Sequence, residues 1–460
     1  MSIQVNPLIF REYDVRGLVD RDLTPEVVEH LGKAYGTYVR RHGYKQVAVG
    51  RDGRLSSPQL KEALIKGILS TGCNVTDIGM CPTPVVYFSI FHLDKEGGIA
   101  VTGSHNPPEY NGFKICVGKE TIFGKQIQHL RQLIEEQDYE TGTGKYDSYD
   151  IIPDYIAFMK DNIKIQGKHK LALDAGNGVA GLVAPKIFAE MRCEITPLYC
   201  EVDGNFPHHG ADPTVVANMQ DLITTVKKEN LELGFAYDGD GDRLGVVDEK
   251  GNILWGDQLL VIFSRDILKE HPGAKIIGEV KCSQLLFDDI AKHGGQPIMW
   301  KVGHSLIKSK LKEEKALLAG EMSGHIFFAD RYFGFDDGIY ASLRFLEIVD
   351  KTGKKPSELI ADLPKTYSTP EIRTECPDEI KFEVVKKAQS YFPKHYNTVT
   401  IDGVRIIFED GWALIRASNT QPVLVLRFEA TSEERLEEIR NIVEEKLEEF
   451  IAEVKLNFDT

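Results

Sequence analysis

The feature that most constrains the fold is a recurring unit: a short apolar segment ends in a small or acidic turn, and an amphipathic helical pattern follows. The apolar segments lie at residues 46–50, 171–173, 234–237 and 275–280. Alternation of buried strands with amphipathic helices is typical of α/β domains. The sequence therefore predicts several α/β domains of one kind, although the units are too loosely similar to be called a sequence repeat.

Polar, turn-rich stretches at residues 140–150, 248–252 and 351–356 divide the 460-residue chain into four segments. The expected domains are 1–149, 150–252, 253–364 and 365–460. The last segment has a different pattern, with strands expected at 398–401, 403–408 and 423–430. It closes with a charged helix expected at 432–454, which opens on the capping pattern Thr431-Ser-Glu-Glu434. This predicts α/β domains followed by a smaller α+β domain.

Composition narrows the class of ligand. Asp and Glu number 70 against 55 Lys and Arg, a net charge of −15, so we expect neither nucleic acid nor an anionic membrane as a partner. An anionic ligand would have to be small and held by basic groups in one cleft. The 7 cysteines lack CxxC spacing, and the amino terminus lacks a secretory-signal pattern. No apolar window approaches the ~20 residues that span a bilayer, so we expect a cytoplasmic protein.

The most specific local motif is Asp238-Gly-Asp-Gly-Asp-Arg243, in which carboxylates alternate with glycines. Three carboxylates this close raise one another's pKa unless a cation lies among them, so the motif predicts a divalent-metal site. Arg243 suits an anionic oxygen, such as that of a phosphate, held beside the metal. The alternative is an EF-hand calcium loop, because Asp238, Asp240, Asp242 and Glu249 fall at its positions 1, 3, 5 and 12.

Two features count against calcium at this motif. Arg243 stands where the EF-hand loop needs glycine, and strands are expected at 234–237 and 244–247 where that loop needs helices. Catalytic Mg²⁺ is therefore favoured over structural Ca²⁺. A solvated acidic hairpin without metal is the third interpretation.

A second polar turn, Val101-Thr-Gly-Ser-His-Asn-Pro107, follows the apolar segment 98–101. Ser104 lies between Gly103 and His105, where a turn can present a hydroxyl nucleophile. The same residues also form an excellent turn with no chemical role. The stretch lacks the G-x-S-x-G arrangement of the α/β-hydrolases, which disfavours a serine esterase.

A third polar turn is Gly320-Glu-Met-Ser-Gly-His325. In an extended segment Glu321 and Ser323 would point the same way and could hold vicinal hydroxyls of a sugar. A loop cap is the alternative, and His325 could equally be a half-buried structural histidine.

The fourth polar turn is Ile415-Arg-Ala-Ser-Asn-Thr-Gln-Pro422. It supplies a guanidinium, two hydroxyls and an amide within five residues, from Arg416, Ser418, Asn419 and Thr420. These groups suit a phosphate bound by side chains and loop N–H groups, and ordinary turn chemistry is the alternative.

Together and in this order, the four motifs resemble those of the α-D-phosphohexomutase superfamily, particularly bacterial phosphomannomutase/phosphoglucomutase. The likeness covers nearly the whole chain and includes Phe10-Arg-Glu-Tyr-Asp-Val-Arg-Gly17 and Gly112-Phe-Lys114. It implies four domains around a central cleft: three similar α/β domains with mixed sheets, then a smaller C-terminal α+β domain. Each motif falls in a different expected segment, as a cleft at a junction of domains requires.

The resemblance also implies roles for individual residues. Ser104 is similar to the family's phosphoserine, and Mg²⁺ would be held by Asp238, Asp240, Asp242 and a phosphate oxygen on Ser104. The other residues that resemble catalytic ones are Arg243, Lys114, Arg16 and His304. The residues implied to bind substrate are Tyr13, Lys281, Gly303, His304, Glu321, Ser323, His325, Arg416, Ser418, Asn419 and Thr420. Which residue moves the proton is left open.

The reaction that the resemblance implies is interconversion of hexose 6-phosphate and hexose 1-phosphate through a phosphoserine and an enzyme-bound hexose 1,6-bisphosphate. That bisphosphate is also the expected activator, and small sugar phosphates are the expected partners, with no obligatory protein partner. Met322 stands where relatives acting on glucosamine phosphates typically differ, which favours mannose and glucose phosphates. The alternatives are a phosphoglucosamine mutase, a phosphoserine-dependent phosphohydrolase and a calcium-binding module.

Overall fold

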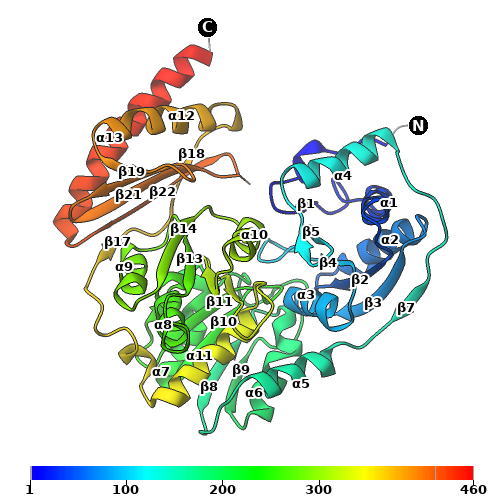
Figure 1. Ribbon diagram of the computed structural model, residues 1–460, viewed down its shortest axis with the longest axis horizontal. Coiled ribbons are helices and arrows are strands. Elements are labelled where there is room, and N and C mark those ends of the chain that lie inside the picture. Colours follow the sequence, from blue (N-terminus) through cyan, green and yellow to red (C-terminus); the bar gives the residue numbers. More distant parts are fainter. Residues whose placement is uncertain (1–2, 420, 459–460) are drawn as a thin grey trace.

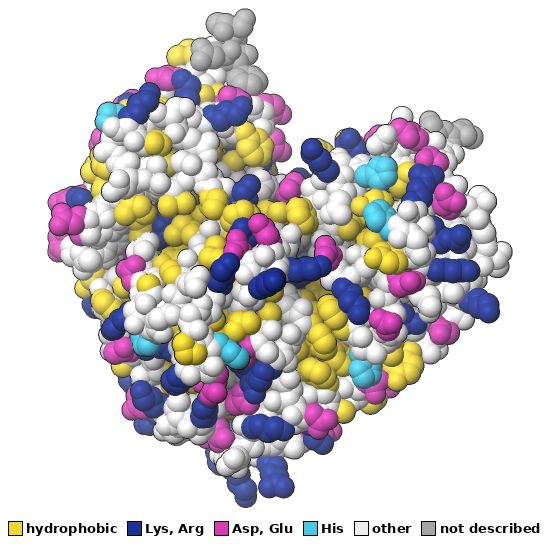
Figure 2. All heavy atoms as spheres, viewed as in Figure 1, with side chains coloured by type: hydrophobic (Ala, Val, Ile, Leu, Met, Phe, Trp, Pro, Cys, Tyr) yellow, Lys and Arg dark blue, Asp and Glu magenta, His cyan; other side chains and the backbone are white. Residues whose placement is uncertain are grey.

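A computed structural model describes residues 3–419 and 421–458, and Figure 1 shows four domains, each built on its own β-sheet. The first domain lies on the right of the view, the second at the bottom, the third at centre left and the fourth at upper left. The space-filling view has a deep notch between the fourth and the first domain (Figure 2). Four domains around a cleft are therefore confirmed.

The first three domains share a four-stranded unit, in which strands lie in the order second, first, third, fourth. The first three strands are parallel and the fourth is antiparallel, so each sheet is mixed, as expected. In the first domain the unit consists of β2 (Gln46–Arg51), β3 (Asn74–Met80), β4 (Gly97–Val101) and β5 (Tyr110–Val117). In the second it consists of β8 (Lys170–Asp174), β9 (Glu194–Leu198), β10 (Leu233–Tyr237) and β11 (Leu244–Asp248). In the third it consists of β13 (Lys275–Glu279), β14 (Gln296–Trp300), β15 (Leu318–Gly320) and β16 (Ile326–Phe328).

Helices cover these sheets, because parallel strands need crossover connections. The first domain has α1 (Pro25–Arg41), α2 (Ser57–Leu69), α3 (Thr83–His92) and α4 (Lys125–Glu136). The next helices are α5 (Ile152–Asn162), α6 (Ala184–Glu190) and α7 (Gln220–Glu229). The third part of the chain adds α8 (Gly256–Glu270), α9 (Gln284–Lys292), α10 (His304–Glu314) and α11 (Gly338–Thr352).

Several short strands extend the first two sheets. They are β1 (Val15–Leu18), β6 (Glu120–Thr121), β7 (Tyr146–Ser148) and β12 (Ile253–Leu254). β7 lies inside the stretch expected to be a seam and pairs with β3. All three of its residues are exposed, so it has no apolar pattern that a sequence could reveal. β12 pairs with β11, so the second sheet runs two residues past the expected seam.

The fourth domain is the expected smaller α+β domain. Its antiparallel sheet contains β17 (Tyr367–Ser368), β18 (Ile372–Glu375), β19 (Asn397–Val399), β20 (Val404–Phe408), β21 (Gly411–Ala417) and β22 (Val423–Ala430). Against β21 and β22 pack α12 (Asp378–Tyr391) and α13 (Glu433–Phe458). The expected capping pattern is wrong by one residue: Ser432, not Thr431, precedes the helix, and its Oγ accepts from Arg435 N at 3.1 Å. None of the helices in the described part of the chain, α13 included, is long and apolar enough to cross a membrane.

The hydrophobic cores divide the molecule differently from the sheets. One continuous core runs through the first three domains, from Ile78 to Leu359. The fourth domain has a separate core between Cys376 and Val454. A small apolar contact of Val280, Trp412 and Leu414 joins the third domain to the fourth. The first three domains therefore form one packed body, to which the fourth is attached through a smaller surface.

Candidate active site

Three of the four polar turns occupy equivalent places in the fold. The serine turn joins β4 to β5, the aspartate turn joins β10 to β11, and the 321–325 turn joins β15 to β16. Each is the connection from the third to the fourth strand of the shared unit. All three therefore lie at the carboxyl ends of parallel strands, which is where open α/β sheets bind their ligands.

The nucleophile candidate Ser104 is buried in a left-handed backbone conformation, with φ 49°. Its N–H donates to Thr102 Oγ1 at 2.8 Å, and its Oγ donates to Asp238 Oδ2 at 2.9 Å. A left-handed serine is strained by roughly 1–3 kcal/mol and is held only where the surroundings fix it. The hydroxyl is thus directed at the aspartates of the second domain.

The three aspartates of the motif converge on one point. One carboxylate oxygen from each of Asp238, Asp240 and Asp242 lies within 4.8 Å of the others, and all three side chains are fully buried. Within the described residues, Asp240 Oδ1 and Asp242 Oδ1 are buried oxygens without a hydrogen-bond partner. A cluster of buried, unpaired carboxylate oxygens is a donor set that fits a hard divalent cation.

Lys114 from β5 balances part of this negative charge. Its Nζ lies 2.8 Å from Asp240 Oδ2 and also pairs with Asp242. Burial and the neighbouring carboxylates raise the pKa of Asp238 well above its usual value. Burial also opposes ionisation of Asp240, but the charge of Lys114 and hydrogen bonds from Lys114 and Thr83 lower the pKa of Asp240. The same carboxylates outweigh burial at Lys114 and raise its pKa, so Lys114 is an ammonium.

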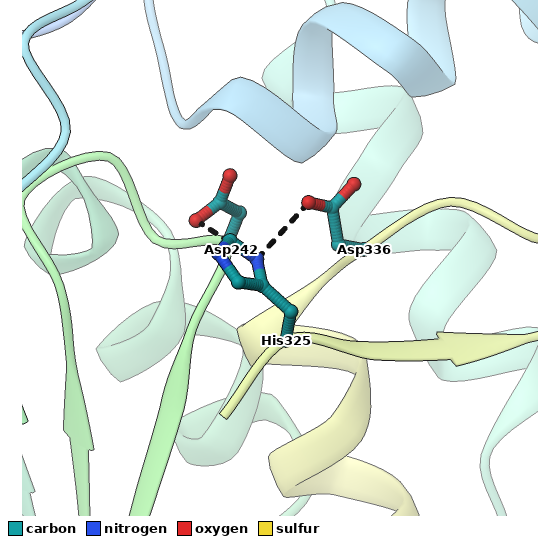
Figure 3. Close-up of side chains that lie close together, drawn as sticks. All are labelled: Asp242, His325 and Asp336. Atoms are coloured by element: carbon teal, nitrogen blue, oxygen red, sulfur yellow. Dashed lines mark ion pairs between the residues drawn. The ribbon is translucent and has the colours of Figure 1, made fainter. Parts of the chain in front are cut away.

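The aspartate turn is joined to the third domain through Arg243 and His325. Arg243 Nε donates to His325 Nε2 at 3.0 Å, and the two backbones form an antiparallel bridge. Figure 3 shows the imidazole between two carboxylates: His325 Nδ1 lies 3.1 Å from Asp336 Oδ2 and 3.5 Å from Asp242 Oδ1. These three side chains are also close enough to hold a cation. His325 is therefore part of the charged centre.

The serine turn carries a second histidine, His105, which is half-buried. His105 Nδ1 lies 2.9 Å from Asp212 Oδ2, and Arg243 Nη1 lies 3.7 Å from Asp212 Oδ1. Burial and the charge of Arg243 lower the pKa of His105 to about 4. His105 is thus neutral near pH 7.

The expectation of an extended segment at Glu321 and Ser323 is wrong. Gly324 N donates to Glu321 O at 3.0 Å, because the β15–β16 hairpin needs a tight turn here. Glu321 is buried, with Oε1 accepting from Gly303 N at 2.7 Å, whereas Ser323 is half-buried. The two side chains still lie on one turn.

The EF-hand interpretation of the aspartate turn is also excluded. The strands β10 and β11 flank the turn where helices would be needed. Glu249, at the twelfth position, accepts a 2.5 Å hydrogen bond from Ser357 Oγ instead of joining the aspartates.

The fourth turn meets the first and third domains at Tyr13. Tyr13 Oη donates to Val302 O at 2.8 Å and accepts from Asn419 Nδ2 at 2.7 Å. A Cβ on Gly303 would lie only 2.5 Å from the Tyr13 ring, so glycine is required at 303 for this approach. The pKa of the Tyr13 hydroxyl is raised, and burial is the main cause. Tyr13 thus lies at a junction of three domains.

Arg416 in the fourth turn is buried, with Nε and Nη2 both 3.2 Å from Asp402 Oδ2. Asp402 Oδ2 also accepts from Val302 N of the third domain at 3.0 Å. Burial opposes the charge on Arg416, but Asp402 outweighs it and raises the pKa of the guanidinium. Ser418 Oγ accepts from Gln421 N at 3.1 Å, which is turn chemistry, and Thr420 lies outside the described residues.

The remaining predicted residues lie around these centres. Arg16 donates to Asn106 Oδ1 in the serine turn at 2.8 Å. Lys281 Nζ pairs with Glu371 at 3.0 Å between the third and fourth domains. His304 begins α10, where burial and Lys308 hold its pKa well below the usual value. The structure therefore brings Ser104, Lys114, Arg243, His325 and the three aspartates into one contact network, and Tyr13, Gly303, Arg416 and Asn419 into another.

Comparison with known families matches all four domains in order. The models for phosphoglucomutase/phosphomannomutase alpha/beta/alpha domains I, II and III match residues 7–141, 153–251 and 255–367, and the model for the C-terminal domain matches 371–446. The chain belongs to the phosphoglucomutase/phosphomannomutase family.

Individual family members are similar along nearly their whole length. A Pseudomonas aeruginosa protein named phosphomannomutase/phosphoglucomutase is 49% identical over 440 residues, which cover 95% of each chain. A protein named phosphoglucomutase from Neisseria gonorrhoeae is 44% identical over 94% of this chain and 95% of its own. The crystal structure of a Burkholderia thailandensis phosphoglucomutase/phosphomannomutase family protein has a TM-score of 0.93 and 43% identity, covering 97% of this chain and 98% of that one.

Sequence reasoning missed several residues of the candidate site in this phosphoglucomutase/phosphomannomutase family member. Thr83 Oγ1 donates to Asp240 Oδ2 at 2.6 Å, and Asp336 and Asp402 hold His325 and Arg416 as described above. Nothing in the sequence around these residues marks them. Arg54 could have been found from the sequence. Asp52-Gly-Arg54 directly follows the strand expected at 46–50, just as the other polar turns follow their strands.

Proposed function

We propose that this chain is a phosphohexomutase that interconverts the 6-phosphates and 1-phosphates of mannose, glucose or both. The observation that carries the proposal is the hydrogen bond from Ser104 Oγ to Asp238, which places a buried hydroxyl nucleophile against the aspartate cluster. The reaction would pass through phosphorylated Ser104 and an enzyme-bound hexose 1,6-bisphosphate. Relatives at 44–49% identity that carry the names phosphomannomutase/phosphoglucomutase and phosphoglucomutase support the substrate class.

We infer that Asp238, Asp240 and Asp242 hold Mg²⁺, because three converging buried carboxylates, two of them with an unpaired oxygen, suit a small hard cation. The bound ion would neutralise charge on the phosphoryl group that Ser104 gives or receives. Arg243 would add a guanidinium beside the same group. Lys114, Arg16, His304 and His325 are the proposed residues that surround the reacting hydroxyl and its proton.

We propose that the fourth turn holds the phosphate that is not reacting, through Arg416, Ser418, Asn419 and Thr420. Because this contact is fixed in the fourth domain, it can hold either phosphate as the sugar turns end for end. Glu321 and Ser323 are proposed to contact sugar hydroxyls, with Tyr13, Lys281, Gly303, His304 and His325 around the sugar. The buried ion pair of Arg416 with Asp402 supports this role, since it keeps the guanidinium charged and in place.

The domain limits that we propose are 1–149, 150–254, 255–364 and 365–460, with the second seam moved so that β12 stays with its sheet. A hexose 1,6-bisphosphate is the proposed activator, because it can phosphorylate Ser104, and each turnover must begin with a phosphorylated serine. We further propose a cytoplasmic enzyme that acts on small sugar phosphates without an obligatory protein partner, nucleic acid or membrane.

A coupled assay on the 1-phosphates of mannose, glucose and glucosamine, with and without glucose 1,6-bisphosphate, tests the proposal. Ser104→Ala should lower the rate by orders of magnitude, because covalent catalysis is removed while the binding groups stay. Ser390→Ala, an exposed serine on α12, is the matched control and should be unaffected. Fully active enzyme that shows no phosphorylated species by intact mass would contradict the mechanism. Phosphate release without isomerised product would show a phosphohydrolase instead.

A further inference from the structure

Arg54 lies directly beneath the serine turn and is only 1% exposed. Its Nη2 donates to Ser104 O at 2.8 Å and to Asn106 O at 2.5 Å. Its Nη1 donates to Pro107 O at 2.6 Å and to Tyr110 O at 3.0 Å. Its Nε donates to Asp52 Oδ2 at 3.1 Å. A guanidinium has five N–H groups, so every one of them has a partner, and four of those partners are carbonyls of one loop.

The loop depends on these donors because its own backbone supplies few. Pro107 and Pro108 have no N–H. Among residues 3–419 and 421–458, the carbonyls of Ser104 and Asn106 accept no backbone N–H. Buried carbonyls almost always need a hydrogen-bond partner, and Arg54 provides one for Ser104 O and Asn106 O, whereas Pro107 O also accepts from Tyr110 N at 3.1 Å.

The contacts also hold both sides of the nucleophile. Asp52 Oδ2 accepts from Gly103 N at 3.2 Å, while Arg54 donates to the carbonyl of Ser104 itself. The fit is close, since a Cβ on Gly103 would lie 2.5 Å from the Arg54 guanidinium. The left-handed conformation of Ser104 persists only where its surroundings impose it, and this pair of side chains grips the peptide on each side.

We propose that Arg54, oriented by Asp52, is a positioning residue for phosphoryl transfer: it sets the place of Ser104 without touching the substrate. The inference rests on the proposed function, because it takes Ser104 as the group that is phosphorylated. Lysine is no substitute, since an ammonium has three N–H groups at one point and cannot donate to all four loop carbonyls and to Asp52. The contacts assigned to substrate lie on other turns, so an altered Arg54 should act on the transfer step and not on binding.

The test is the rate at which dephosphorylated enzyme is phosphorylated by glucose 1,6-bisphosphate in a single turnover, followed by intact mass. Displacement of a reacting group by about 1 Å costs on the order of 10²-fold, so Arg54→Lys should lower this rate about 10- to 100-fold. In steady state kcat should fall by a similar factor, with KM for glucose 1-phosphate within about twofold of wild type. Arg344→Lys is the matched control: Arg344 is 2% exposed and pairs with Asp330, far along the chain from the serine turn.

The outcomes separate the two hypotheses. If wild-type enzyme takes no phosphoryl group onto Ser104, the proposed function fails. If wild type is phosphorylated and folded Arg54→Lys reacts at the same rate, or if KM rises while kcat is unchanged, the role of Arg54 is overturned. Should Arg54→Lys not fold, Asp52→Asn carries the test, because it weakens the orientation of Arg54 and keeps its four carbonyl bonds. An unchanged phosphorylation rate in Asp52→Asn would then overturn the proposal.

Discussion

Replacing Gly239 by alanine should separate the nucleophile from the aspartate cluster. Gly239 lies between the first two aspartates, and a Cβ there would lie 2.4 Å from Ser104 O. Neither backbone is free to give way. Gly239 N donates to Ala211 O at 3.2 Å and its carbonyl accepts from Val179 N at 3.1 Å, while Ser104 O is held by Arg54. One of the two turns must therefore move.

The size of the effect follows from this contact. Ordinary contacts of a Cβ begin near 3.4 Å, so the turns must separate by about 1 Å. A displacement of that size between reacting groups costs on the order of 10²-fold in rate. Overpacking of this kind lowers the free energy of unfolding by about 1–3 kcal/mol. We therefore expect kcat for conversion of glucose 1-phosphate to fall about 100-fold, with the protein still folded at room temperature.

The assay is steady-state conversion of glucose 1-phosphate with saturating glucose 1,6-bisphosphate, alongside a thermal unfolding curve. Gly210→Ala is the matched control, because the nearest atom to its Cβ would be Asn218 Nδ2, at an ordinary 3.4 Å. It should keep wild-type kcat. A Gly239→Ala enzyme with kcat within about threefold of wild type would show that the close approach of the two turns does not matter for transfer, and the reasoning would be refuted.

Three further outcomes are expected. Asp240→Asn should weaken divalent-ion binding and activity together, because one of three anionic ligands is lost; a Mg²⁺ titration measures this, and full activity in excess chelator would rule out a catalytic ion. Arg416→Ala should raise KM for every sugar phosphate more than it lowers kcat, because a fixed phosphate contact acts in the ground state and the transition state alike. The loss in kcat/KM should correspond to about 2–4 kcal/mol. An unchanged KM would contradict the proposal that Arg416 holds the non-reacting phosphate. Burial opposes the charge on His169, yet its hydrogen bonds to Glu232 and Asp350 raise the pKa of the imidazole. The stability that charged His169 contributes is therefore complete below about pH 6.5, and it is lost as pH rises through the folded-state pKa. Urea unfolding between pH 6 and 9 should therefore show a loss of stability that His169→Gln lacks, and parallel profiles for the two proteins would count against it.

Six strands of the shared unit could be predicted from sequence because each is largely a buried apolar run beside a polar turn: β2, β4, β8, β10, β11 and β13. β9 and β14 have no buried residue and gave no such signal. The same logic fails at β7, whose exposed residues carry no pattern, and at the 321–325 turn, where tight hairpin geometry overrides the expected extended segment. It fails by one residue at the start of α13, because Thr431 and Ser432 are both competent caps: Thr431 N donates to Asp410 O at 3.0 Å, and Ser432 caps the helix.

Within the site, the sequence pointed to Ser104 and the three aspartates because their chemistry is concentrated in short motifs. Residues that act on the site from elsewhere gave much weaker signals. Arg54 reaches a serine 50 positions away, and Asp402 reaches Val302 across 100 positions. Such pairs depend on how whole sheets pack, which no local pattern encodes. The side chains that contact the motif residues from distant parts of the chain could therefore be identified only in the structure.

The apolar face of the first domain that packs against the second and third domains stays exposed during synthesis until those domains have been made. Ile78, Val86 and Phe88 belong to the core that reaches Leu359, whereas the opposite face of the same sheet is covered by residues between 3 and 139. At ~5–20 residues per second, the ribosome needs roughly 15–60 s to make the stretch between Ile78 and Leu359. During that time the first domain, folded but with one face uncovered, is expected to expose a hydrophobic surface to which chaperones can bind. Ribosome-bound chains that end soon after Tyr155 should bind an apolar dye that chains extended past Cys376 no longer bind.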